Sequence, residues 1–216
     1  MKQIRVSADI AGENDVGGIA GIAGEHNSQN DTFLGERLVV DATISGTNRV
    51  GGLFGSANHL KMTLQKSAFR GHISATNNIS GLVGYARHEE RVKGKSTHLK
   101  CTNSFAAITM GHRDRYGAGI IGGFSFSFRS EDAIYAGLLG AEDTGQTCFY
   151  DQTSDPHALH PKAKSITGTG LPAADLRQRE TYAPFNPGVW DIPSTGLPKL
   201  QWEKEATKAT SVGTGS

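Results

Sequence analysis

The chain has almost no net charge and few large side chains with which to fill a core. Its 216 residues include 22 basic and 21 acidic side chains, which leaves a formal charge of +1. This balance excludes a general attraction to nucleic acid or to anionic membranes. Aromatic residues make up only 7% of the sequence. A narrow core, in which backbones approach one another closely, is therefore more plausible than a wide globular one.

Long apolar segments are also lacking. The uninterrupted apolar runs extend over a few residues only, so we predict no membrane insertion. The first six residues, MKQIRV, lack the apolar stretch of a secretion signal. The chain is expected to be either cytosolic or a mature or excised part of an exported protein. Its two cysteines, Cys101 and Cys148, allow one disulfide at most and are equally compatible with small buried side chains.

Proline is absent from the first 155 residues, and all seven prolines lie beyond Cys148. Because proline cannot donate a hydrogen bond to a sheet, this shift in composition divides the chain. We predict repeats over residues 1–148, a capping segment over 149–202 that folds over the last coil, and a disordered tail or linker over 203–216. Within the cap, residues 172–179 predict one short helix with proline in its first turn.

Glycine, by contrast, is abundant, with 28 residues, and much of it lies in a recurring phrase. The phrase reads VGGIAG at 16–21, VGGLFG at 50–55 and ISGLVG at 79–84, with looser copies at 117–122 and 135–140. The spacing of the copies is uneven but lies in the range of solenoid repeats. Their central glycines, which we expect to let neighbouring coils stack closely, are Gly18, Gly52, Gly81, Gly119 and Gly137.

The repeat extends beyond this phrase. In each of the first three copies an isoleucine precedes an asparagine by four residues and the phrase by six. The three pairs are Ile10 with Asn14, Ile44 with Asn48, and Ile73 with Asn77. Small residues followed by asparagine are typical of turns, and asparagine tolerates a left-handed backbone. Each unit is thus predicted to form a strand, an asparagine turn, and a second, inner strand made by the phrase.

These observations predict an all-β fold. Repeated short strands without a sustained helical period indicate a right-handed parallel β-helix, a solenoid of about five irregular coils closed by the C-terminal cap. Neighbouring coils would stack about 4.8 Å apart. The asparagines Asn14, Asn48 and Asn77 are then expected to form a structural row that satisfies the backbone groups of the turns.

The phrase and its surroundings resemble the GLUG repeat family, named for Gly-Leu-hydrophobic-Gly. The best match is residues 67–84, and the closing stretch adds CFYD at 148–151, WDI at 190–192 and LPKL at 197–200. The resemblance covers about residues 6–202. It implies a secreted or surface-displayed bacterial protein of the adhesin type, with the repeats forming a β-helix-like stalk, and it supplies no catalytic residues. The chain departs from the family pattern in its irregular fourth and fifth copies.

Histidine follows the phrase in three copies, at His26, His59 and His88. A metal needs three or four convergent ligands, whereas these histidines lie at unequal offsets in polar turns. We therefore predict exposed turns and no metal site. The glycine phrase lacks the Gly-Lys-Ser/Thr ending of a phosphate loop, so no nucleotide and no cofactor is expected.

Close carboxylate pairs occur at 131–132, at 142–143, and at Asp151 with Asp155. Paired carboxylates hydrolyse glycosidic bonds, but none of these pairs recurs at equivalent positions of adjacent repeats. We expect no enzymatic activity. The alternative of a polysaccharide lyase or glycoside hydrolase with a β-helix fold stays open.

Recognition is expected on the loops after the phrase, chiefly residues 85–100 and 112–116. The predicted contact residues are Tyr85, Arg87, His88, Arg91 and Tyr116. The favoured function is a non-catalytic structural or binding module that contacts a glycan or a cell-surface protein. A further alternative is a subunit of an extracellular fibre or of a phage or secretion appendage, which would self-associate through the open end of the β-helix, where the edge at Ile4 and Val6 is unpaired.

Overall fold

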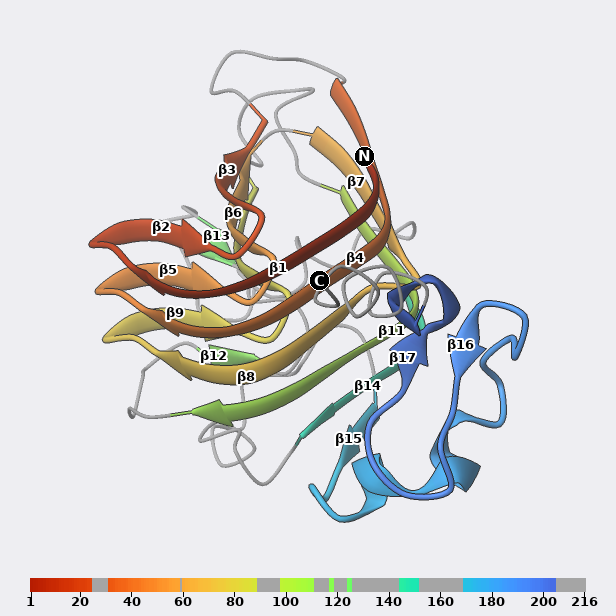
Figure 1. Cartoon of the computed structure of the whole chain (residues 1–216). Helices are drawn as coiled ribbons and strands as arrows, with labels where there is room; N and C mark the ends of the chain where they lie inside the picture. The colour runs from red at the N-terminus through yellow and green to blue at the C-terminus, as the bar shows by residue number, and fades with distance from the viewer. Residues whose placement is uncertain are drawn as a thin grey trace, which may run out of the picture.

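The structure, a computed structural model, describes residues 1–24, 31–58, 60–88, 98–110, 117–118, 124–125, 144–151 and 169–204. Over these residues the protein is mostly β-strand, which confirms the all-β prediction. Its three main sheets are parallel throughout, and the strands of each sheet follow one another in chain order (Figure 1). None of the described helices is long and apolar enough to cross a membrane.

The largest sheet, called the long sheet here, has seven strands. They are β1 (Lys2–Ala11), β4 (Asp31–Ser45), β7 (Leu60–Gln65), β8 (Ala68–Ser74), β11 (His98–Met110), β14 (Thr144–Asp151) and β15 (Thr169–Leu171). The second sheet contains β2 (Asn14–Gly17), β5 (Asn48–Gly51), β9 (Asn77–Ser80) and β12 (Gly117–Ala118). The third contains β3 (Ala20–Ala23), β6 (Phe54–Asn58), β10 (Val83–His88) and β13 (Phe124–Ser125). Each of the first four repeats thus contributes to all three sheets.

The register of the strands confirms the spacing of the repeat. Ile10 lies opposite Ile44, and Ile44 lies opposite Ile73, in the long sheet. In the second sheet Asn14 pairs with Asn48 and Asn48 with Asn77. The first residues of the phrase are also in register through the fourth copy, where Ile79 lies opposite Gly117. The fifth copy, with Gly137, lies outside the described residues, as does Gly119 of the fourth.

The phrase itself is not a single inner strand, and that part of the prediction is wrong. Its first two residues end a strand of the second sheet, its last residues begin a strand of the third, and the two residues between them bend. Leu53 and Leu82 occupy this bend and are fully buried, because the corner turns them into the core. Successive corners are joined by backbone hydrogen bonds, such as Leu53 N to Leu82 O at 2.9 Å.

Two kinds of close approach require glycine in the phrase. At Gly52 a methyl group would lie 2.2 Å from the carbonyl oxygen of Gly81 and 2.3 Å from the ring of Phe69. At Gly51 it would lie 2.4 Å from the backbone nitrogen of Gly84, in the third sheet. The first contact supports the expected stacking of neighbouring repeats. The contact between Gly51 and Gly84 was not expected from the sequence, and it lets the second and third sheets approach each other closely.

Left-handed backbone recurs at the same place in each repeat, one residue after the predicted asparagine. The residues with positive φ there are Asp15, Arg49 and Asn78, at 53°, 56° and 56°. A second row interrupts or bends the strands of the long sheet at Gln3, Arg37, Lys66 and Asn103. The predicted asparagines do not themselves have the left-handed backbone, and their side chains stack: Asn48 Nδ2 donates to Asn14 Oδ1 at 3.0 Å. This contact supports their structural role, while the side chain of Asn77 lies outside the described part.

The interior of the stack is a narrow, mainly aliphatic core. It contains Val40, Ile44 and Ile73 from the long sheet, with Val50 and Ile79 from the second, all of them fully buried. Cys101 is also fully buried in this core. In the register of β11 and β14 it lies opposite Gly145, whereas Cys148 lies opposite Ser104.

A second hydrophobic cluster lies outside the stack, on the outer face of the long sheet. Val39, Ala68 and Phe105 form one column across this face, and the chain from 172 to 204 packs against them. That segment, called the strap here, contributes Tyr182, Phe185, Trp190 and Leu200. The strap lies at one side of the stack (Figure 1), so this part of the predicted cap packs beside the stack and not over its last repeat. Among the described residues β15 extends the end of the long sheet, and residues 152–168 of the predicted cap lie outside the described part.

The predicted boundaries change as well. The helix expected over 172–179 is replaced by two short 3-10 helices, Asp175–Arg177 and Arg179–Tyr182. The strap continues through an antiparallel pair, β16 (Trp190–Asp191) with β17 (Lys199–Leu200). β14 runs across the predicted boundary after residue 148. Glu203, assigned by sequence to the disordered tail, is 2% exposed and belongs to the folded part.

Candidate functional site

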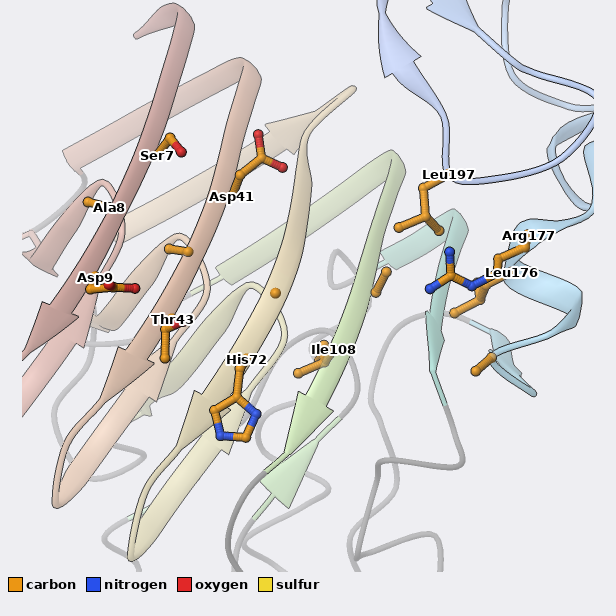
Figure 2. Close-up of a pocket in the computed structure, with 14 residues that line it drawn as sticks. Ser7, Ala8, Asp9, Asp41, Thr43, His72, Ile108, Leu176, Arg177 and Leu197 are labelled. Atoms are coloured by element: carbon orange, nitrogen blue, oxygen red, sulfur yellow. The ribbon is translucent and has the colours of Figure 1, made fainter.

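A groove of about 680 Å³ lies between the outer face of the long sheet and the strap. Its floor comes from β1, β4, β8 and β11, and its far wall comes from the strap at Leu176, Arg177 and Leu197 (Figure 2). The groove exists because the strap covers the column of Val39, Ala68 and Phe105 and reaches the next column at Arg70. The rest of that column and the column beyond it are left open.

The floor is polar because the strands alternate. Inward residues such as Ile10, Ile44 and Ile73 fill the core, so the residue before each of them points outward. These three neighbours are Asp9, Thr43 and His72, which lie in register on successive strands. Figure 2 shows them following one another across the sheet. They present a carboxylate, a hydroxyl and an imidazole at intervals of about 4.8 Å.

A second polar column lies two residues earlier on each strand, where Ser7 is opposite Asp41 and Asp41 is opposite Arg70. Arg70 is 11% exposed, and its Nη2 donates to Asp41 at 3.0 Å and to Glu203 at 2.7 Å. Burial opposes the charge of Arg70, but the hydrogen bonds to Asp41 and Glu203 outweigh it and raise the pKa of the guanidinium. Arg70 also donates to the carbonyl of Pro198 at 3.0 Å. This arginine therefore joins the floor of the groove to the strap.

Asp41 is neutralised from both sides. Arg5 approaches it at 3.1 Å from the neighbouring strand, opposite Arg70. The carboxylate of Asp41 is consequently occupied in structural contacts, and Asp9 is the carboxylate of the floor that makes no ion pair with a described residue. With Arg177 exposed on the wall, the groove carries roughly balanced charge.

The wall is held rigidly by the lateral hydrophobic cluster. Tyr182 donates its hydroxyl to the carbonyl of Leu176 at 2.8 Å, and burial raises the pKa of that hydroxyl. The Tyr182 ring meets Phe105 edge to face, with centroids 5.6 Å apart. Because Phe105 belongs to β11, this contact ties the wall to the sheet that forms the floor.

None of the predicted contact residues is among the described residues that line this groove. Tyr85 is 6% exposed, and Arg49 lies over its ring at 5.9 Å, so the expectation of an exposed contact residue is corrected. Arg87 and His88 end β10, and their side chains lie outside the described part of the structure. Arg91 and Tyr116 lie outside the described residues altogether, as do His26 and His59.

No cluster of three metal-ligating side chains occurs among the residues that the structure describes. The carboxylate pairs at 131–132 and 142–143 and the side chains of Asp151 and Asp155 are not among them. The groove was missed although the sequence contains its signal: the residues one and three places before each repeated isoleucine are polar or small. The missing information was that the strap leaves most of these two columns open.

Comparison with protein-family models gave no match, and comparisons with curated proteins and with solved structures gave none either.

Proposed function

We propose that the protein is a right-handed parallel β-helix that serves as a non-catalytic binding module, and that it holds an extended, hydroxyl-rich chain such as a glycan in the groove beside the strap. The β-helix is supported by three parallel sheets whose strands follow chain order. Connections between parallel strands are right-handed in about 98% of cases, which supports the handedness. The GLUG-like phrase favours a secreted or cell-surface setting.

The observation that carries this proposal is the column Asp9, Thr43 and His72 at the floor of the groove. Donors and acceptors repeat there at the spacing of neighbouring strands, about 4.8 Å. A glycan presents hydroxyl groups along an extended chain and so matches a row of hydrogen-bonding side chains. The charge balance of the groove favours an uncharged glycan over a polyanion. His72 is the only ring in the described lining, so hydrogen bonds rather than aromatic stacking would give the affinity.

A glycan array, followed by titration of the bound sugar, tests this proposal. Thr43→Ala should weaken binding about five-fold, since one net hydrogen bond contributes about 1 kcal/mol. The matched control is Thr32→Ala, an exposed threonine of the same strand outside the groove, which should leave binding unchanged. Binding that survives both Thr43→Ala and His72→Ala would contradict the assignment of the groove.

The same sugar should be assayed for new reducing ends. The proposal expects none. Glycoside hydrolysis needs two carboxylates, and among the described groove residues Asp9 is the only carboxylate that makes no ion pair. Release of product that Asp9→Asn abolishes would instead show a glycan-cleaving enzyme. Binding to a cell-surface protein without binding to any sugar would also count against the glycan assignment.

A further inference from the structure

The first repeat lies at one end of the described stack. β1, β2 and β3 are the outermost strands of their sheets, and in the described part each pairs on one side only. Inward residues of β1, namely Ile4, Val6 and Ile10, are only partly buried, whereas their counterparts in β4 are fully buried. Figure 1 shows β1 along this edge of the long sheet. An edge of this kind is a template for pairing with another strand.

The residues of β1 that face the open edge can be identified from the pairing with β4. Ala11 lies opposite Ser45, and Gly12 N donates to the carbonyl of Ser45 at 3.1 Å. Because successive residues of a strand direct their backbone groups to opposite edges, the even-numbered residues of β1 bond to β4. The odd-numbered residues Arg5, Ser7 and Asp9 therefore direct their N–H and C=O groups toward the open edge.

The same three residues carry a self-complementary charge pattern on the outer face. When two copies of β1 pair antiparallel about Ser7, Arg5 of each copy lies opposite Asp9 of the other. The inward residues also match, since Ile4 then faces Ile10 and Val6 faces Ala8 of the second copy. A shift by one residue would place core residues on the outer face. A shift by two would place Arg5 opposite Ser7 and lose the charge pairing.

We propose that the protein forms a two-fold symmetric homodimer through antiparallel pairing of β1 with β1 of a second copy, centred on Ser7. Arg5 is 39% exposed; it contacts Asp41 through Nε and Nη2 and lies 3.9 Å from Glu203 through Nη1. In the dimer this guanidinium exchanges its longer contact, with Glu203, for Asp9 of the second copy. Asp9 is exposed. The interface is isologous, as expected for a dimer with two-fold symmetry. The two long sheets become one continuous sheet, and the two grooves, each bordered by Ser7 and Asp9, meet at the two-fold axis.

Light scattering after size exclusion, in the absence of ligand, tests the dimer independently of the proposed function. The wild-type protein should show twice the monomer mass. Asp9→Arg places two arginines opposite each other at both ends of the interface and should weaken the dimer at least ten-fold. The control is Glu13→Arg, the same change of charge at an exposed residue of the first repeat outside β1, which should leave the dimer intact. A wild-type monomer at all accessible concentrations would overturn the proposal.

Cysteine cross-linking tests the register. In the proposed dimer, residue 7 of one copy lies opposite residue 7 of the other. The two Cα atoms are then about 5.5 Å apart, a distance that a disulfide between two Ser7→Cys copies can span. Oxidised glutathione should therefore convert this variant to a covalent dimer, which non-reducing electrophoresis detects. Asp9→Cys is the matched control, because its two copies lie roughly 14 Å apart along the strands. Equal cross-linking of both variants would overturn the register, and the wild-type protein, oxidised in parallel, gives the background from its own cysteines.

Discussion

The two hydrophobic clusters of the protein differ in composition and in origin. The cluster inside the stack is mainly aliphatic and draws on all three parallel sheets, so each of its positions recurs from repeat to repeat. The cluster outside the long sheet is largely aromatic and joins one column of the sheet to a segment without any repeat. The first sets the shape of the stack, whereas the second decides which part of the outer face remains open.

This difference bears on function. A repeated core can be lengthened by further repeats without creating a unique site, because every repeat resembles its neighbour. The strap breaks that equivalence: it covers the column of Val39, Ala68 and Phe105, reaches the column of Ser7 at Arg70, and leaves the remainder of that column and the column of Asp9 open. The groove is thus a property of the aromatic cluster as much as of the sheet.

Removing the largest side chain of the aromatic cluster should have the largest effect. Trp190 is 1% exposed, and its ring lies 5.7 Å from Phe105 and 5.1 Å from Phe185, between centroids. Trp190→Ala should lower the free energy of unfolding by about 3–5 kcal/mol, measured by urea denaturation. It should also weaken ligand binding, because the wall of the groove depends on this packing.

Two variants sharpen that measurement. Trp202 is only half-buried, so Trp202→Ala should cost less than Trp190→Ala. The indole N–H of Trp190 has no hydrogen-bond partner in the described structure, so Trp190→Phe leaves no acceptor unpaired and should be the mildest of the three. If Trp190→Ala unfolds the strap in a separate transition and leaves the stack unchanged, the two clusters are not one cooperative unit.

The sequence predicted the stack better than the strap, for a physical reason. In-register repetition places Ile10, Ile44 and Ile73 in one column, and three copies of one spacing determine that column without knowledge of the whole fold. The strap has no copy of itself to compare with. Its position depends on contacts between residues far apart in the chain, such as the ion pair of Arg70 with Glu203, whose partners lie 133 residues apart.

The corner made by the phrase was missed because a strand and a corner share the same signal over six residues. Apolar residues alternating with glycine suit either, and only the contact between Gly51 and Gly84 across two sheets distinguishes them. Likewise, Arg49 has a left-handed backbone although arginine is not a typical turn residue, whereas Asp15 at the equivalent position is one. The side chains of Arg49 and Asp15 form a bidentate ion pair, in which both N–O distances are 2.6 Å.

A smaller effect is expected from adding one methyl group at the corner. Gly52→Ala would force the new carbon against the Gly81 carbonyl and the Phe69 ring, and overpacking of this kind costs about 1–3 kcal/mol. Gly188 is the control, since a methyl group there would approach only the side chain of Asn186, at 3.2 Å. Equal unfolding midpoints for Gly52→Ala and Gly188→Ala would show that the corner is looser than described.

The smallest effect concerns one carboxylate at the bend of the long sheet and depends on pH. Lys66 donates a hydrogen bond to Glu36 at 3.1 Å, and this bond, with the charges of Lys66, Arg37 and Lys2, outweighs partial burial and lowers the pKa of Glu36. A lowered pKa in the folded state contributes stability above the ordinary pKa of glutamate, and that contribution is lost as pH falls through the folded pKa. Glu36→Gln should therefore cost under about 1 kcal/mol at pH 7. The difference from wild type should shrink as the pH falls below the ordinary pKa of glutamate and vanish below the lowered pKa of the folded state, when thermal unfolding is followed across pH. A difference that grows as the pH falls would mean that Glu36 is stabilised in its protonated form, which would contradict the ion pairs with Lys66 and Lys2.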